Sequence, residues 1–196
     1  MRLADDPRWQ RLNNPHFQCP CCGERHAGLF DIAFDHPDPF AMPEGGVQLN
    51  SALPATTGDI LTEDFARFGE HRFVRAVLPM TLAGTGPGPD LVQFSFGVWA
   101  TLAPENFDAM VEAFDSRDQS HLGPYFSWLM NKLPGASNTP PKCTMYPQKD
   151  GQRPVLLLED DTHPFYAAQD SAITLDEVLD LYALIGHDIR PHLLDG

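Results

Sequence analysis

Basic residues are scarce in this 196-residue chain, which has 13 Lys and Arg against 27 Asp and Glu and a formal net charge of −14. No dense Lys/Arg stretch is present, so the positive patch that binds nucleic-acid phosphates is missing. No apolar run approaches the roughly 20 residues of a membrane span, and the N-terminus lacks the apolar segment of a signal peptide. We therefore expect no nucleic-acid or membrane partner and a cytoplasmic location.

Familiar catalytic motifs are missing as well. The sequence has no G-x-S-x-G nucleophile elbow, no Walker A loop, no dinucleotide fingerprint and no H-E-x-x-H pair. The glycines of residues 84–88 alternate with prolines, which lack the N–H groups that a phosphate cradle uses. With no recognisable nucleophile–base pair, the sequence favours a non-catalytic module over an enzyme.

The chain does contain a group of three cysteines near its N-terminal end, within a segment that we call the knuckle (Cys19–Gly23). Cys19 and Cys22 have the spacing of half a zinc ribbon, and His26 is the candidate third ligand. The candidates for a fourth ligand are His16, Cys143 and His163. Because no second cysteine pair is present, the sequence slightly favours a knuckle without metal over a zinc site at Cys19, Cys22 and His26.

Alternating apolar residues predict the body of a β-sheet. Residues 74–82 and 91–102 form one predicted antiparallel hairpin, and residues 142–148 and 153–159 form a second across the Asp150-Gly151 turn. The apolar run inside the last segment, residues 155–158, does not alternate, so we expect it to be central and buried on both faces. Residues 125–133 fit either a strand or a short helix.

Helical patterns alternate with these hairpins. Apolar spacing predicts helices at residues 104–115 and 174–185, the second opened by a capping box at its first turn. A short helix is predicted within residues 3–14. The sequence therefore predicts an N-terminal helical extension, residues 1–16, and a single α+β domain, residues 17–196, in which two or three helices pack on an antiparallel sheet of hairpins.

Four side chains are candidates for lining a ligand pocket: Arg75, Trp99, Arg153 and His163. Trp99 lies on a mostly polar strand face where it could floor a pocket, although coverage by residues 125–128 is the favoured interpretation. His163 follows three carboxylates, a group suited to acid–base chemistry or cation binding, or to a solvated loop. Two function classes remain open: a non-catalytic module that binds a protein or small-molecule partner, and a small hydrolase-like enzyme that gathers these four side chains.

Six short segments, in order over residues 17–186, resemble a bacterial family of small proteins of unknown function. Its members open with a CxxCG knuckle and continue with segments of the types F-I-R-G, G-V-W, P-Y-F-G-W-L, R-P and H-P-L-A. The matching segments here are Cys19–Gly23, Phe73–Ala76, Gly97–Trp99, Pro124–Leu129, Arg153–Pro154 and His163–Tyr166. Ala76 and Ser127 replace glycines of the family pattern, and Asp59-Ile60-Leu61 stands where members carry a further cysteine. The resemblance implies a domain definition and no known activity.

Overall fold

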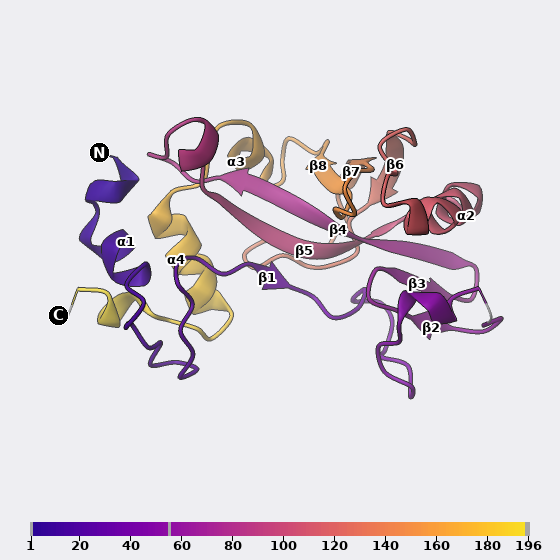
Figure 1. Cartoon of the computed structure of the whole chain (residues 1–196), viewed down its shortest axis with the longest axis horizontal. Coiled ribbons are helices and arrows are strands. Elements are labelled where there is room, and N and C mark those ends of the chain that lie inside the picture. The colour runs from indigo at the N-terminus through magenta and orange to yellow at the C-terminus, as the bar shows by residue number, and fades with distance from the viewer. Residues whose placement is uncertain (1, 55, 195–196) are drawn as a thin grey trace.

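The computed structural model describes residues 2–54 and 56–194, which form one mixed sheet with helices packed around it (Figure 1). The strands are β1 Ile32–Ala33, β2 Ile60–Leu61, β3 Phe65–Phe68, β4 His71–Thr81, β5 Gln93–Thr101, β6 Tyr125–Trp128, β7 Lys142–Tyr146 and β8 Val155–Leu158. The α-helices are α1 Pro7–Leu12, α2 Pro104–Ala113, α3 Tyr166–Asp170 and α4 Leu175–Leu184. No helix within these two ranges is long and apolar enough to cross a membrane.

Both predicted hairpins are confirmed. β4 and β5 pair antiparallel along their length, with Arg75 opposite Trp99 and Val77 opposite Gly97. β7 and β8 pair antiparallel across the turn at Asp150. Residues 125–128, which fitted either a strand or a helix, form the strand β6 on the other side of β7. The chain therefore folds as a single α+β domain, as the order of its elements predicts.

The sheet is mixed, so the expectation of a purely antiparallel sheet is wrong. Its main order is β1-β5-β4-β8-β7-β6, and β1 runs parallel to β5 while β8 runs parallel to β4. Turn chemistry specifies antiparallel partners only where strands are neighbours in sequence. β1 and β8 are both far in sequence from their parallel partners, and the pattern of apolar residues does not record such pairings.

The edge of β4 changes partner halfway along the strand. β3 pairs with its first residues, Phe65 lying opposite Val74, whereas β8 meets it at Val77. Pro79 has no N–H to continue the ladder toward β8. The Gln169 side chain, from α3, bridges the two strands instead. The Gln169 amide donates to the Pro79 and Leu156 carbonyls and accepts from the Leu158 N–H. We call this junction of β4, β8 and Gln169 the seam.

The main core lies on the face of β4 and β5 that α4 covers, and Phe94 and Tyr182 meet there in an edge contact. The N-terminal segment joins this core through Leu3 and Leu12, and the Leu3 N–H donates to the Gly84 carbonyl. A smaller cluster around Trp99 packs under β2 and β3. The N-terminal extension is therefore built into the same hydrophobic core as the sheet.

β8 is central in the sheet, between β4 and β7, but it is not buried on both faces. Leu156 and Leu158 point into the core, and Leu157 between them is 40% exposed. The expectation of burial on both faces is therefore wrong. The three consecutive leucines conceal the period-two alternation that the strand itself imposes.

Candidate metal centre and arginine pocket

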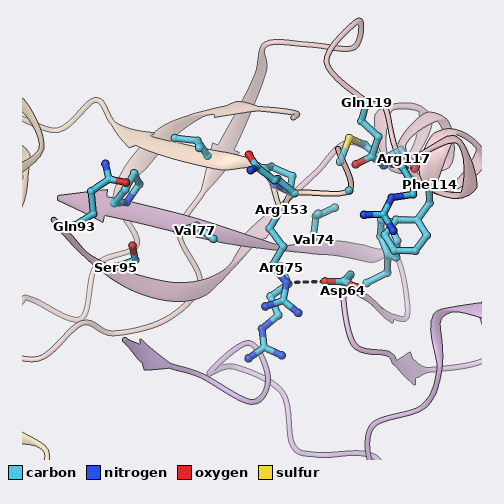
Figure 2. A pocket seen from close by; sticks show the side chains of 17 residues that line it. Asp64, Val74, Arg75, Val77, Gln93, Ser95, Phe114, Arg117, Gln119 and Arg153 are labelled. Atoms are coloured by element: carbon cyan, nitrogen blue, oxygen red, sulfur yellow. Dashed lines mark hydrogen bonds and ion pairs between the residues drawn. The ribbon is translucent and has the colours of Figure 1, made fainter. Parts of the chain in front are cut away.

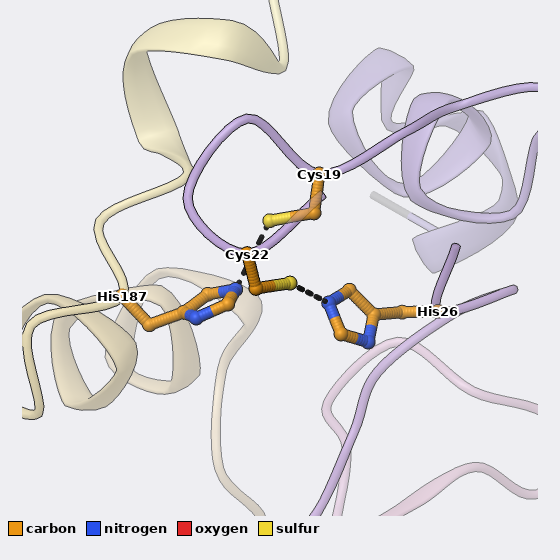
Figure 3. A group of neighbouring side chains, drawn as sticks. All are labelled: Cys19, Cys22, His26 and His187. Atoms are coloured by element: carbon orange, nitrogen blue, oxygen red, sulfur yellow. Dashed lines mark hydrogen bonds between the residues drawn. The ribbon is translucent and has the colours of Figure 1, made fainter. Parts of the chain in front are cut away.

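The knuckle is a tight turn closed by its own backbone. The Cys19 N–H donates to the Glu24 carbonyl at 2.8 Å, and the Gly23 N–H donates to the Cys19 carbonyl at 2.7 Å. Gly23 has φ +78°, a conformation that side chains disfavour, so a glycine is suited to this position. The turn brings the Cys19 and Cys22 side chains toward the same space (Figure 3).

A histidine from the other end of the chain faces the knuckle. α4 ends in a Schellman motif, in which the His187 N–H donates to the Tyr182 carbonyl at 2.8 Å and the Gly186 N–H donates to the Ala183 carbonyl at 3.1 Å. Gly186 supplies the left-handed residue, with φ +81°. This helix end fixes the backbone of His187 and directs its ring toward Cys19 (Figure 3).

Four ligand atoms therefore converge, from Cys19, Cys22, His26 and His187, and all lie within 4.8 Å of one another. The Cys19 Sγ is 3.0 Å from the His187 Nε2, and the Cys22 Sγ is 3.2 Å from the His26 Nε2. Tetrahedral zinc with sulfur and nitrogen ligands needs ligand atoms about 3.3–3.8 Å apart. This group, which we call the Cys2His2 cluster, can hold a metal ion with small side-chain adjustments.

Aromatic packing supports the two imidazoles. The Phe30 ring lies 4.4 Å from the His26 ring and 4.8 Å from the His187 ring, centroid to centroid. Behind it, the Tyr182 ring stacks on Phe30 at 4.0 Å. The Tyr182 hydroxyl accepts from the Phe30 N–H and donates to the Phe30 carbonyl. Tyr182 and Phe30 therefore position both histidines.

The four residues of the Cys2His2 cluster differ in burial. Cys19 is fully buried, Cys22 is exposed, and the two histidines are half-buried. Burial, with the neighbouring His26, lowers the pKa of His187, which favours the neutral imidazole that binds metals. The third cysteine, Cys21, lies outside the cluster, and its thiol donates to the Asp188 carbonyl. This contact also holds the knuckle against the segment that follows α4.

The three ligands that the sequence singled out, Cys19, Cys22 and His26, lie together, whereas the expected sources of the fourth were wrong. Cys143 is buried in β7, His16 lines a separate hollow near His192, and His163 lies beside the Phe165 backbone. The fourth member is His187. Its only sequence signal was its place two residues after the helix predicted at residues 174–185.

Two of the four pocket candidates line one cavity of about 860 Å³ (Figure 2). Arg75 extends from β4, and Arg153 precedes β8. The Arg153 Nε donates to the Asp64 carboxylate at 2.7 Å. Sequence analysis did not single out Arg117, which lies after α2 and lines the same cavity. We call this cavity the arginine pocket.

The other two candidates lie outside the arginine pocket. Trp99 is fully buried beneath Arg75, its indole N–H donates to the Phe34 carbonyl, and the Arg75 guanidinium carbon lies 5.9 Å from its ring. His163 is 7% exposed, and burial lowers its pKa. It lines a different hollow, together with Asp38 and Asn131. The arrangement that the hydrolase-like alternative requires, with all four side chains in one pocket, is not present in the described structure.

No curated protein and no solved structure matched the chain. A family model, described as an uncharacterized protein conserved in bacteria (DUF2199), matches residues 18–173. The match includes Cys19, Cys22 and His26, and it ends before His187. It covers most of the chain and agrees with the family resemblance of the six short segments. The chain belongs to this uncharacterised bacterial family, DUF2199.

Proposed function

We propose that this protein is a non-catalytic, zinc-binding module of the bacterial cytoplasm, in which Cys19, Cys22, His26 and His187 hold one structural zinc ion. The convergence of four N and S ligand atoms within 4.8 Å carries the proposal. Cys2His2 sets are characteristic of structural zinc, and reducing compartments keep such cysteines as thiols. Softer sulfur and imidazole donors favour zinc over magnesium or calcium, which prefer oxygen.

The completeness of the ligand set argues for a structural ion. Catalytic zinc sites generally keep one coordination position for water or substrate beside three protein ligands. Here four side chains supply four ligand atoms, two of them from the short segment Cys19–Cys22. Such a set fills a tetrahedron with protein atoms, which supports a binding module rather than a metal hydrolase.

The proposed ion joins distant parts of the chain. His187 follows α4, while Cys19, Cys22 and His26 all precede β1. The Cys21 thiol, which donates to the Asp188 carbonyl at 3.3 Å, also joins the knuckle to the C-terminal segment. Because binding free energy of a structural metal contributes to folding, zinc would stabilise this end of the molecule most strongly.

Elemental analysis of protein purified without chelators tests the proposal, and we expect about one zinc per chain. Replacing zinc with Co²⁺ should give the visible absorption of a tetrahedral site together with thiolate charge-transfer bands. His187→Ala should weaken zinc binding and alter the cobalt spectrum. Cys21→Ala is the matched control, since Cys21 belongs to the knuckle but not to the Cys2His2 cluster, and it should retain the metal.

Two results would contradict the proposal. One is wild-type protein that stays well below one zinc equivalent after incubation with excess zinc, with Cys22 freely reactive. The other is a His187→Ala variant with unchanged zinc affinity and cobalt spectrum. The cobalt spectrum of the wild type decides the question by itself if the variant does not fold.

A further inference from the structure

The lining of the arginine pocket is mainly positive, whereas the chain as a whole is strongly negative. It opens where the edge of β4 passes from β3 to β8, and its charged lining residues are Arg75, Arg117, Arg153 and a single carboxylate, Asp64. The whole chain has 13 basic and 27 acidic residues. Three arginines around one cavity of about 860 Å³ are therefore a local concentration of positive charge, in a volume suited to a small molecule.

Arg75 is the least compensated of the three. Its Nε is buried and has no hydrogen-bond partner within the described ranges, and its guanidinium lies over the Trp99 ring. Burial and the nearby positive charge of Arg153 lower its pKa, while Asp64 and Asp35 oppose that shift. A partly buried positive charge without a bonded counter-ion costs free energy, which an anion beside the guanidinium would recover. The arrangement favours an anion beside Arg75.

The single carboxylate of the lining is already engaged. Asp64 accepts from the Arg153 Nε at 2.7 Å and from the Asn50 side-chain amide at 2.7 Å. Its side chain is 18% exposed. These two bonds fix the carboxylate beside Arg153, so Asp64 orients that guanidinium while Arg75 keeps an unpaired donor.

The third arginine is held at one end of the pocket by an unusual backbone. Arg117 has φ +60°, and its guanidinium donates to the Asp150 carbonyl. Gly151 lies directly beneath it, since a Cβ there would come within 2.9 Å of the Arg117 side chain. A larger residue at position 151 would displace the guanidinium from this position. The β7–β8 turn thus holds Arg117 beside the cavity.

The rest of the lining mixes apolar and polar side chains, with Gln119 near Arg117 and Val77 near Ser95 (Figure 2). Val74 and Phe114 lie at the end near Arg117, and Gln93 and Ser95 lie at the opposite end, with Arg75 and Arg153 between them. A ligand that fits this distribution has an anionic group beside Arg75 and Arg153 and a compact apolar part beside Val74 and Phe114. Pockets of this kind use a few polar groups to orient a mostly apolar ligand.

We propose that the arginine pocket binds a small organic oxyanion, a carboxylate or a phosphate monoester attached to a compact apolar body. The oxyanion pairs with Arg75 and Arg153, because the planar guanidinium matches two oxygens of such a group. The apolar body lies along Val74 and Phe114. This inference assigns binding only, and it does not depend on the proposed zinc ion.

Titration of ¹⁵N-labelled full-length protein with phenyl phosphate and with phenylacetate tests the proposal. Benzyl alcohol, which lacks the charge, and inorganic phosphate, which lacks the apolar body, serve as comparison ligands. At about 0.15 M salt, where the net negative charge of the protein is screened, we expect saturable binding at least about tenfold tighter for one of the two acids than for both comparison ligands. The largest amide shifts should fall at Arg75, Val77 and Val155.

The identity of the tighter acid separates the two sources of the oxyanion. Tighter phenyl phosphate binding assigns a phosphate monoester, and tighter phenylacetate binding assigns a carboxylate. Failure of both acids to exceed the comparison ligands, or shifts confined to another surface, would overturn the proposal. The lining of the pocket includes none of Cys19, Cys22, His26 and His187, so the pocket and the zinc site can fail independently.

Three variants complete the test. Arg75→Gln should weaken binding of the tighter acid by about tenfold or more, since it removes a charged donor. Arg72→Gln removes the same charge from the same strand but outside the pocket, and should leave affinity unchanged. Asp64→Asn should tighten binding, because it removes the one negative charge of the lining but keeps a side-chain oxygen that can accept from the Arg153 Nε. Tightening cannot arise from misfolding, so Asp64→Asn decides the matter if Arg75→Gln does not fold. Unchanged or weaker binding by Asp64→Asn would count against the proposal.

Discussion

Removing one hydroxyl, by Tyr182→Phe, should destabilise the protein strongly for so small a change. Tyr182 is fully buried, and its hydroxyl accepts from the Phe30 N–H at 2.9 Å and donates to the Phe30 carbonyl at 2.6 Å. Phenylalanine leaves both backbone groups without this partner, at about 1–3 kcal/mol for each buried group. Because Phe30 is half-buried and water can reach part of it, we expect the free energy of unfolding to fall by about 2–4 kcal/mol.

Tyr182→Phe should also weaken zinc binding, because Tyr182 packs against Phe30, which contacts His26. The Phe30 ring lies between the Tyr182 ring and the His26 ring, with centroid distances of 4.0 Å and 4.4 Å. A looser Phe30 backbone leaves His26 less well positioned. Residues that orient metal ligands typically change affinity by about 10–100-fold when altered, so zinc affinity should fall within that range.

Urea unfolding followed by circular dichroism, at one fixed zinc concentration, measures the effect on stability. Tyr166→Phe is the control, because Tyr166 is 38% exposed and no hydrogen bond of its hydroxyl is present in the described structure. Its free energy of unfolding should change by less than about 0.5 kcal/mol. A loss for Tyr182→Phe that is no larger than that of the control would refute the assignment of the two hydrogen bonds.

Three further predictions concern other parts of the fold. Gln169→Ala should lower the free energy of unfolding by about 1–3 kcal/mol, and Gln169→Glu should not restore it, because a carboxylate cannot donate to Leu156; urea unfolding checks both. The hydrogen bond from the Arg8 guanidinium lowers the pKa of Asp6, so this contact stabilises the fold above the ordinary carboxyl pKa of 3.8 and is lost as the pH falls through the lower folded value. Asp6→Asn should therefore be less stable than wild type at pH 7, and the difference should disappear in acid unfolding curves. Burial raises the pKa of Cys143 to about 12, so at pH 8 its thiol should react with Ellman's reagent only after unfolding.

Local patterns predicted the elements that local interactions determine. The alternation in β4 and β5 and the capping box at Thr174 each depend on residues close in sequence, and both occur as expected. The two parallel pairings escaped prediction because they depend on how distant segments pack. β1 pairs over only two residues, Ile32 and Ala33, too short a stretch to show a period.

Three of the four residues of the candidate metal site were predictable from the sequence, and the fourth was not. The spacing of Cys19, Cys22 and His26 indicates that their ligand atoms can meet, because a tight turn connects them. His187 is brought to them by the direction of α4 and by the helix end at Gly186, which are properties of the folded chain. Sequence alone identified Arg75 and Arg153 but gave no reason to place them beside Arg117.

The seam has a consequence for how the native protein fluctuates. One register pair, Val77 with Val155, and the Gln169 side chain join β8 to β4, whereas β5 pairs with β4 from Phe73 to Thr81. β8 should therefore separate from β4 at a lower free energy than β5 does, which native-state hydrogen exchange would reveal as weaker protection along the β4–β8 edge. Arg75 lies in β4 and Arg153 directly precedes β8, so a molecule that binds both arginines would hold the two strands together and slow that exchange.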